Sequence, residues 1–390
     1  VYNKKTTDLL MNNLRIASAN GFTSLSKANV GVLRNKGWEL NAYTSKFARV
    51  GKFSMKLRGN IAQNFNEVEE MDPLILEALN GAETYQPGNL AYNNRVQIGN
   101  ALGSIYGLRY KGVYRYDYDH NGYTTASISS YGYAEVNNTG YDAQGNPINT
   151  AAAAQRRHEN FTCPIAYDAD GNMLTDAKGI PLPMYYCYNE SYRKQFQGGD
   201  AIYEDVNHDG QIDRYDMVYL GNSNPKCNGG FGFTLFYGRF SLNTGFNFRM
   251  GNKIINLARA NYESMRSNTN QSYATTWRWR KNGDETVIPR ALTNVNGYES
   301  YNSLPSDRYV ENGNYLRLQY VQLRYEFNPQ KLKKYGIRQL TLSASANNVW
   351  CWSKYTGVDP DVSPQGFSVS TDNSRTPRTK SFTCSANLSF

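Results

Sequence analysis

The chain has 390 residues, including 33 glycines and 32 tyrosines, and its 42 basic and 33 acidic side chains give a formal net charge of +9. Its mean hydropathy is −0.66, and it contains no run of roughly 18 uncharged apolar residues that could cross a membrane as a helix. Aromatic residues make up 14% of the chain, which excludes extended disorder because disordered chains contain few of them. The abundance of glycine and tyrosine favours many short strands joined by turns.

Several segments alternate apolar and polar residues with a period of two, which indicates strands with one apolar and one polar face. The alternation is clearest at residues 53–58, 240–249 and 382–390. A slip in this parity between Leu318 and Val321 predicts a β-bulge. In chain order, strands are expected near residues 1–10, 31–46, 51–66, 91–99, 101–116, 229–237, 239–250, 314–327, 338–350 and 379–390.

Two architectures fit strands of this kind. A β-sandwich buries the apolar face against a second sheet, whereas a transmembrane barrel turns it to lipid and keeps the polar face toward a wet lumen. The connections decide between them, because outer-membrane barrels alternate short turns with long extracellular loops. Short connections are expected near 47–50, 100, 238 and 328–337, and long ones near 11–30, 67–90, 117–228, 251–313 and 351–378.

The sequence therefore predicts an all-β protein, a transmembrane antiparallel β-barrel with long extracellular loops. Barrels of about 22 strands carry a plugged lumen, so ten strands with loops of this length are expected to be the C-terminal portion of such a barrel. Residues 1–390 would then belong to one barrel domain. The first residues, Val1 to Lys5, include neither an initiator methionine nor an apolar leader, so the plug and the early strands are expected to lie outside this chain.

Several short motifs carry a family resemblance. Residues 199–213 (GDAIYEDVNHDGQID) and 221–226 (GNSNPK) resemble a signature of the SusC/RagA-like TonB-linked outer-membrane transporters. Residues 35–39 (NKGWE), 315–318 (YLRL), 347–348 and 355–361 (YTGVDPD) are similar to further segments of these TonB-dependent receptors. A last strand that ends in Phe390 resembles the signal read by the barrel-assembly machinery. The resemblance covers nearly the whole chain in the right order.

This resemblance implies TonB-dependent active import of a nutrient, an oligosaccharide or a peptide, across the outer membrane of a Gram-negative, Bacteroidetes-like bacterium. It implies a SusD-like surface lipoprotein as a lid, a TonB complex that acts through the missing part of the protein, and contact with membrane lipid and lipopolysaccharide. The alternatives left open are a soluble secreted β-sandwich binding module with a calcium-clipped loop, and a passive porin.

The residues themselves give no sign of an enzyme. The chain contains no Gly-x-Ser-x-Gly, P-loop or paired-histidine motif, and its aspartates lie in turn signals. Its basic residues are distributed over strands and loops, which argues against nucleic acid as a partner. We therefore expect a protein that is not an enzyme and does not bind nucleic acid.

One loop has the spacing of an EF-hand-type calcium site. Oxygen-bearing side chains recur at alternate positions, and Gly210 lies where the sharp turn of such a loop needs glycine. The alternative is a turn without metal, because Asp and Asn side chains also bond to their own backbone. A structural Ca²⁺ ion is the one cofactor that the sequence suggests. Its candidate ligands are Asp205, Asn207, Asp209, Gln211, Asp213 and Asp216.

Basic residues on the polar faces form a second candidate site. A lumen lined by them should concentrate anions, which suggests a substrate with carboxylates or sulfates. The favoured alternative is that they pair with acids on the missing plug. The lumen-lining candidates are Lys52, Lys56, Arg58, Arg109, Lys111, Arg115, Arg249, Arg317 and Arg324. Cys163 and Cys187 share a turn-rich stretch and are candidates for a disulfide, with free buried thiols as the alternative.

Overall fold

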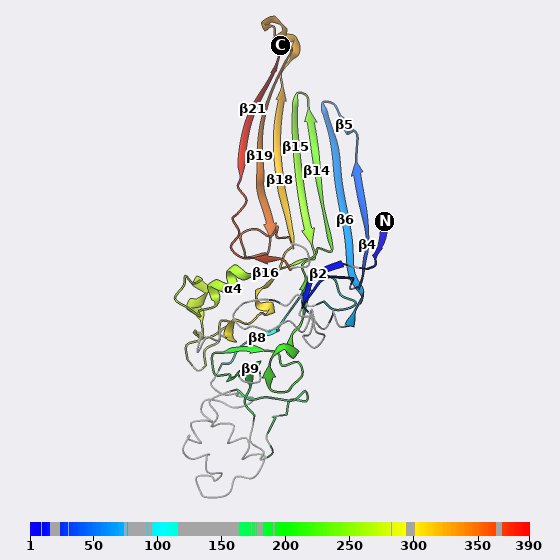
Figure 1. Ribbon diagram of the computed structural model, residues 1–390. Coiled ribbons are helices and arrows are strands. Elements are labelled where there is room, and N and C mark those ends of the chain that lie inside the picture. The colour runs from blue at the N-terminus through cyan, green and yellow to red at the C-terminus, as the bar shows by residue number, and fades with distance from the viewer. Residues whose placement is uncertain are drawn as a thin grey trace.

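One large antiparallel sheet dominates the computed structural model (Figure 1). The structure describes residues 1–8, 10–15, 24–29, 31–73, 76, 92, 96–115, 164–172, 174, 175, 177, 182–189, 192–281, 283–293, 301–363 and 369–390. The sheet has nine strands in the order β1-β4-β6-β14-β15-β18-β19-β21, with β5 paired to β6, and we call it the wall sheet. Its strands are β1 (Tyr2–Thr6), β4 (Gly31–Tyr43), β5 (Phe47–Val50), β6 (Phe53–Met71), β14 (Cys227–Tyr237), β15 (Phe240–Met250), β18 (Tyr315–Glu326), β19 (Gln339–Ser353) and β21 (Ser381–Ser389).

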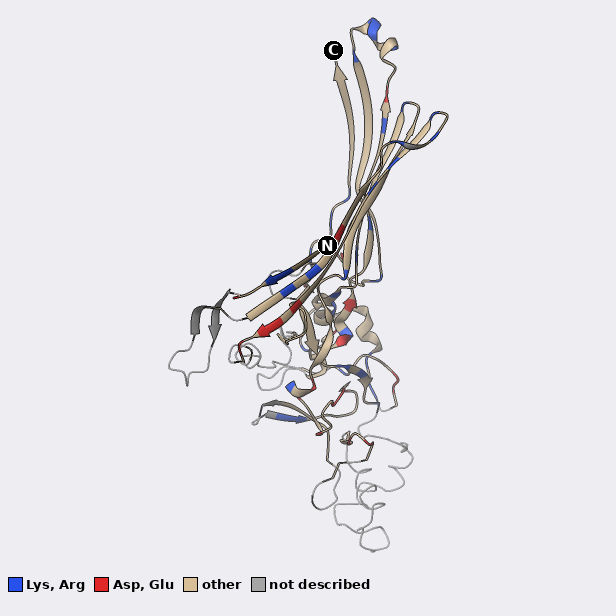
Figure 2. Ribbon diagram, turned by 90° about the vertical axis from the view of Figure 1, so that its right-hand side faces the viewer, with Lys and Arg blue, Asp and Glu red and all other residues tan. Residues whose placement is uncertain are grey.

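The predicted alternation places side chains on two opposite faces of the wall sheet. Apolar residues pair across neighbouring strands, as where Phe246 lies opposite Phe231 with ring centroids 4.8 Å apart. This apolar face is open along the sheet: the side chains of Trp350 and Phe382 are 55% and 80% exposed. In Figure 2 the wall sheet is a curved layer, and among the described residues no second sheet covers its apolar face. A soluble sandwich would bury these rings.

The β-bulge predicted between Leu318 and Val321 is confirmed. The register of β18 shifts between Leu318 and Tyr320 against β19, and the register of β15 shifts between Gly245 and Phe246 against β18. The extra residue shifts the parity of the strand by one, so that Leu316 and Leu323 both lie in apolar rows although they are seven positions apart.

Tight turns join the strands at the end of the wall sheet that carries the C-terminus. Gly238, with φ of +58°, turns the chain from β14 into β15. Between β18 and β19 the chain forms the short helices α5 (Pro329–Leu332) and η6 (Lys333–Tyr335) and ends them at Gly336, with φ of +73°. The short connections predicted near residues 238 and 328–337 are thus confirmed.

The long connections fold into a unit at the other end of the wall sheet (Figure 1). This loop unit consists of the described residues of 96–115, 164–226, 251–314 and 354–378, and a separate hairpin pairs β2 (Leu10–Arg15) with β3 (Ser24–Asn29). No described helix is both long and apolar enough to cross a membrane. The elements of the loop unit are β7 (Ser104–Gly107), β8 (Tyr110–Val113), β9 (Tyr185–Asn189), β10 (Tyr192–Gln195), β11 (Ala201–Tyr203), β12 (Gln211–Ile212), η2 (Arg214–Asp216), β13 (Val218–Asn222), β16 (Lys253–Asn256), α4 (Leu257–Glu263), η3 (Tyr273–Trp277), η4 (Tyr301–Ser303), η5 (Asp307–Tyr309), β17 (Val310–Asn312) and β20 (Thr371–Asp372).

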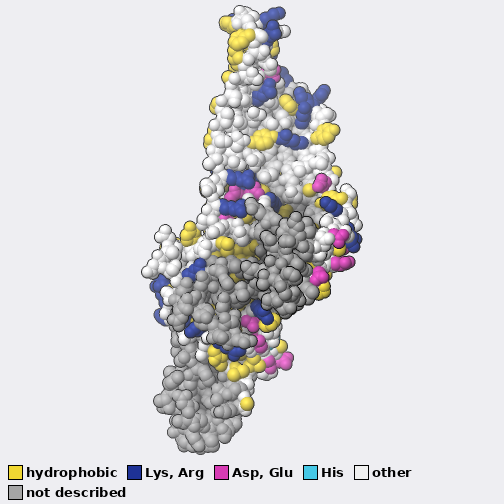
Figure 3. All heavy atoms as spheres, viewed as in Figure 1, with side chains coloured by type: hydrophobic (Ala, Val, Ile, Leu, Met, Phe, Trp, Pro, Cys, Tyr) yellow, Lys and Arg dark blue, Asp and Glu magenta, His cyan; other side chains and the backbone are white. Residues whose placement is uncertain are grey.

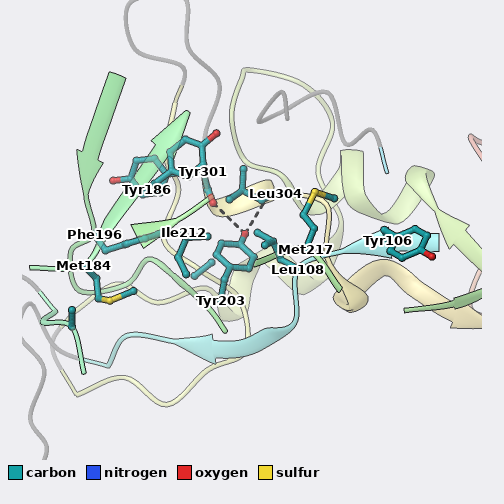
Figure 4. Close-up of a cluster of buried hydrophobic side chains, with 12 residues drawn as sticks. Tyr106, Leu108, Met184, Tyr186, Phe196, Tyr203, Ile212, Met217, Tyr301 and Leu304 are labelled. Carbon is teal, nitrogen blue, oxygen red and sulfur yellow. Dashed lines mark hydrogen bonds between the residues drawn. The ribbon is translucent and has the colours of Figure 1, made fainter. Parts of the chain in front are cut away.

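Aromatic and aliphatic side chains together form the core of the loop unit (Figure 4). The hydroxyl of Tyr203 donates to the carbonyl of Tyr301 at 3.1 Å and accepts from the amide of Leu304 at 3.2 Å. Beside this core, Asp200 is fully buried and accepts hydrogen bonds from Arg290 Nε at 2.7 Å and from the Asn302 amide at 3.0 Å. The carboxylate therefore joins segments about ninety to a hundred residues apart, and the loop unit has its own packed interior.

Two of the ten expected wall strands are not found there. Residues 96–99 lead into a turn, and the earlier part of the strand expected at 91–99 is largely outside the described residues. The strand expected at 101–116 is wrong as a wall strand: β7 pairs with β13 and β8 pairs with β11, all within the loop unit. The alternation of tyrosines with basic residues in this stretch serves a half-buried strand in either setting.

Candidate functional site

The polar face of the wall sheet forms continuous rows of hydrogen-bonding side chains. Arg324 lies opposite Ser241 on β15 and Ser343 on β19. One residue pair further along, Gln322 lies opposite Asn243. On the face seen in Figure 3, Lys and Arg side chains lie along the upper part of the sheet, and Asp and Glu side chains lie mostly lower, toward the loop unit. A surface of this kind suits contact with water and a polar solute.

The loop unit closes over the polar face and leaves the apolar face open. Asn66 of β6 accepts a hydrogen bond from the backbone amide of Leu102 at 2.8 Å. Arg249 of β15 donates to the carbonyl of Val362 at 3.0 Å. Both wall residues are on the polar face, so this face is the inner one and the open apolar face is the one suited to lipid.

Three arginines and two aspartates fasten the last long loop to the wall. Arg317 donates to Asp359 at 2.5 Å, and Arg249 lies 3.3 Å from Asp361. Arg378, farther along the same loop, pairs with both aspartates. We call these five residues the last-loop clamp. The sequence marked the aspartates only as part of a family-like motif, because nothing in it shows which arginines they contact.

Three of the nine predicted lumen residues are in the loop unit and not on a wall strand. Arg109 and Lys111 both pair with Glu204 at 2.9 Å. Arg115 pairs with Glu285 at 2.7 Å. The hydrogen bonds from its two partners hold the pKa of Glu204 below its usual value. These cations are therefore neutralised inside the loop unit, and their predicted place on the barrel wall is wrong.

The other basic candidates are on or beside the wall. Arg249 and Arg317 belong to the last-loop clamp. The guanidinium of Arg58 stacks over the ring of Tyr320, 5.6 Å from its centroid. This ring also packs on Gly245, where a Cβ would lie 2.4 Å from the ring. Lys56 lies 5.9 Å from the Phe236 ring, and Lys52 and Arg324 are exposed. Pairing with a plug stays a prediction.

The predicted calcium loop forms a tight turn held by its own carboxylates. Asp205 accepts a hydrogen bond from the amide of Gly210 at 2.8 Å, and Asp216 accepts one from the amide of Asp213 at 2.8 Å. Gly210 has φ of +80°, as the spacing requires. Among the described residues, no group of three or more acidic, histidine or cysteine side chains is arranged to hold a metal ion.

The carboxyl groups of this loop nevertheless repel one another. Burial, together with the neighbouring charges of Asp205 and Asp213, raises the pKa of Asp216 to about 7. Burial likewise raises the pKa of Asp205 and of Asp213. A cation at this loop would relieve the repulsion, but the oxygens as placed bond to backbone amides. Calcium binding therefore stays a prediction.

The cysteine and C-terminal predictions are also untested. Cys163 lies outside the described residues, so the proposed disulfide has only one described partner. Cys187 is buried, and its thiol donates to Gln211 Oε1 at 3.0 Å. Phe390 follows directly after β21 and is exposed. Its role as an assembly signal stays a prediction.

Comparison with known sequences identifies three curated relatives, all from Formosa agariphila. TonB-dependent receptor P39 is 29% identical over 99% of this chain, and receptors P26 and P3 are 25% and 23% identical over 94% and 100% of it. The matches cover 33%, 29% and 32% of the relatives, so the chain spans about a third of their length. No protein-family model matches the chain.

Solved structures agree in fold. The RagAB peptide transporter matches 100% of this chain and 32% of its own chain, with a TM-score of 0.62 and 17% identity. The RagAB peptide importer in the closed-closed state matches 100% and 33%, with a TM-score of 0.59 and 18% identity. These relatives are receptors and transporters, which agrees with the expectation that the chain is not an enzyme. The resemblance found in the sequence is confirmed: the chain is similar to TonB-dependent receptors along nearly its whole length and has the barrel fold of the RagAB transporter.

Proposed function

We propose that this chain is the C-terminal part of the barrel wall of a TonB-dependent importer in the outer membrane. The observation that carries the proposal is the two-faced wall sheet, whose open apolar face suits lipid while its polar face is closed at one end by a large loop unit. Similarity to TonB-dependent receptors along the whole chain supports it. In this mechanism TonB pulls on a plug outside this chain and opens a path along the polar face.

The proposal includes a SusD-like surface lipoprotein that caps the loop unit and a nutrient substrate, an oligosaccharide or a peptide. The solved structures with the same fold are described as a peptide transporter, which makes peptides the first class to test. The loop unit has its own aromatic core and its own ion pairs, so it can offer a lid a firm docking surface. The proposed host is a Gram-negative, Bacteroidetes-like bacterium.

The experiment is uptake by cells that carry the full-length protein. The gene is deleted and then restored, and uptake of fluorescent peptides and of fluorescent oligosaccharides is measured with TonB present and with TonB removed. We expect restored uptake of one of the two classes only when TonB is present. The full-length protein should also co-purify in detergent with a surface lipoprotein.

Two results would contradict the proposal. Uptake that persists without TonB would identify a passive pore. Recovery of the protein in a soluble fraction without detergent, with no change in migration on heating, would instead identify a secreted binding module. The fluorescent dye alone is the control in both strains.

A further inference from the structure

A cavity of about 470 Å³ lies where β6, β15 and β18 of the wall sheet meet the loop unit. Its volume is within the range of small-ligand sites, about 300–1,000 Å³. Seven of its fifteen lining residues are asparagine, and Lys226 and Lys253 also line it. None of these fifteen described residues is acidic. The cavity therefore combines many amides with positive charge.

Three of the seven asparagines of the cavity, Asn222, Asn312 and Asn314, use their side-chain oxygens within the protein and leave their NH₂ groups over, whereas Asn66 and Asn224 donate through Nδ2 to Asn35 and to the carbonyl of Leu102. Asn222 Oδ1 accepts from the amide of Asn224 at 2.8 Å, and Asn312 Oδ1 accepts from the amide of Asn314 at 2.9 Å. Asn314 Oδ1 in turn accepts from the amide of Gly251 at 2.6 Å. A backbone N–H can only donate, so these bonds assign the oxygen of each side-chain amide. Within the described part of the chain, the NH₂ groups of Asn222, Asn312 and Asn314 have no acceptor.

The two lysines are held at the cavity by glycines. A Cβ on Gly251 would lie 2.6 Å from the Cγ of Lys226, and a Cβ on Gly221 would lie 2.6 Å from the Cγ of Lys253. Both glycines have positive φ, +85° and +142°. Each lysine stem thus packs onto bare backbone. Neither lysine has an acidic partner within 4.0 Å among the described residues.

The side chain of Asn252 is independent evidence that the cavity binds a ligand. Its side chain lines the cavity, the residue is 1% exposed, and neither its Oδ1 nor its Nδ2 has a hydrogen-bond partner. Gly313 makes room for it, because a Cβ there would lie 2.3 Å from Nδ2. Buried amides without partners are costly and rare, which indicates that something else completes the bonds of Asn252.

We propose that this cavity is a substrate subsite for a carboxylate carried on a hydrogen-bonding chain. The surplus of N–H donors and the two ammonium groups call for an acceptor with negative charge, and Asn252 can both donate to and accept from the groups next to it. The C-terminus of a peptide and the uronate of an oligosaccharide both have this chemistry. The proposal rests on the importer function proposed above and specifies part of its substrate.

The test is binding to the purified full-length protein in detergent, measured by calorimetry. One pair of probes is a tripeptide with a free C-terminal carboxylate and the same tripeptide with a C-terminal amide. The second pair is a disaccharide with one uronate and its neutral counterpart. We expect the wild type to prefer the carboxylate form of one pair by at least tenfold, and Lys253→Gln to reduce that preference about tenfold. Lys331→Gln, in the α5 turn at the far end of the wall, is the matched control.

Asn252→Leu separates ligand binding from folding. Because the amide has no partner in the protein, its near-isosteric replacement should weaken probe binding several-fold without lowering the melting temperature. The proposal of a carboxylate subsite is contradicted if neither carboxylate form is preferred or if Lys253→Gln binds like Lys331→Gln. It is also contradicted if Asn252→Leu melts several degrees lower than the wild type. Uptake without TonB would contradict the importer function and leave these binding results as they stand.

Discussion

From the last-loop clamp we predict how much free energy holds the last loop to the wall. Arg317 and Asp359 have side chains that are only 6% and 15% exposed, and their atoms Nη2 and Oδ1 are 2.5 Å apart. Asp359→Ala leaves this guanidinium buried without another acidic partner among the described residues, and its Nε already lacks a partner. Removing one member of a buried ion pair costs about 3–5 kcal/mol, because the other charge stays uncompensated.

Two companion variants distinguish a buried charge from a lost contact. Arg317→Met leaves Asp359 with Arg378, at 3.5 Å, and with the backbone amide of Asp361, at 2.9 Å. We expect a smaller cost for it, about 1–2 kcal/mol. The double variant removes both charges and should be less costly than Asp359→Ala alone, since a pair replaced by apolar groups is often nearly neutral.

The assay is hydrogen exchange of the backbone amides of Asp359, Asp361, Val362 and Ser363 in the full-length protein. A cost of about 3–5 kcal/mol corresponds to faster exchange by roughly two to three and a half powers of ten. Arg375→Met, an exposed arginine of the same loop, is the control and should change exchange by less than about threefold. The reasoning fails if Asp359→Ala exchanges like this control, or if the double variant exchanges as fast as Asp359→Ala.

Three further predictions concern the wall and the calcium loop. Phe382→Arg on the open apolar face should cost about 2–4 kcal/mol and lower the temperature at which the heat-modifiable band is lost, whereas Thr383→Arg on the polar face should not; equal effects would argue against lipid at the apolar face. Gly229→Ala should destabilise the barrel by about 1–3 kcal/mol in the same assay, because its Cβ would lie 2.2 Å from a backbone oxygen, whereas Gly59→Ala should be tolerated, because its Cβ would lie 3.6 Å from the nearest atom, an ordinary van der Waals contact. Calorimetry should detect calcium binding that Asp209→Ala abolishes and that weakens as the pH falls below about 7, since the last carboxyl of the loop must lose its proton; no binding at millimolar calcium would end that idea.

The wall could be predicted from the sequence because its two faces lie in different surroundings. A strand between an apolar and a polar medium must alternate strictly, so a single break in parity was enough to locate the bulge beside Gln319. The tight turns were equally legible, because Gly238 and Gly336 have positive φ, which glycine tolerates best. These signals are local in the chain and need no knowledge of long-range contacts.

The structure of the loop unit could not be predicted from local sequence patterns. Tyr106 and Tyr110 alternate with polar residues as wall strands do, but the strands that contain them pair within the loop unit and pack against its core. The clamp is hidden for another reason. Arg317 and Asp359 are 42 positions apart, and a charged residue carries no sign of its partner in the sequence. The cavity lined by seven asparagines, here called the asparagine cavity, is likewise formed by segments far apart in the chain.

The ion pairs of the basic residues show which positive charges remain available to a substrate or a plug. Five of the nine candidates are held by acids of this same chain, either in the loop unit or in the last-loop clamp. The four without an acidic partner among the described residues are in the half of the wall away from the loop unit, while Lys226 and Lys253 are at the end that meets it. These four are Lys52, Lys56, Arg58 and Arg324. A substrate carboxylate captured at the asparagine cavity would therefore meet its next cations only deep in the barrel, where acids of a plug would compete for the same side chains. On the proposed importer function, charge would select a substrate at the mouth of the barrel, while deeper inside the same positive charge would hold the plug until TonB pulls it away.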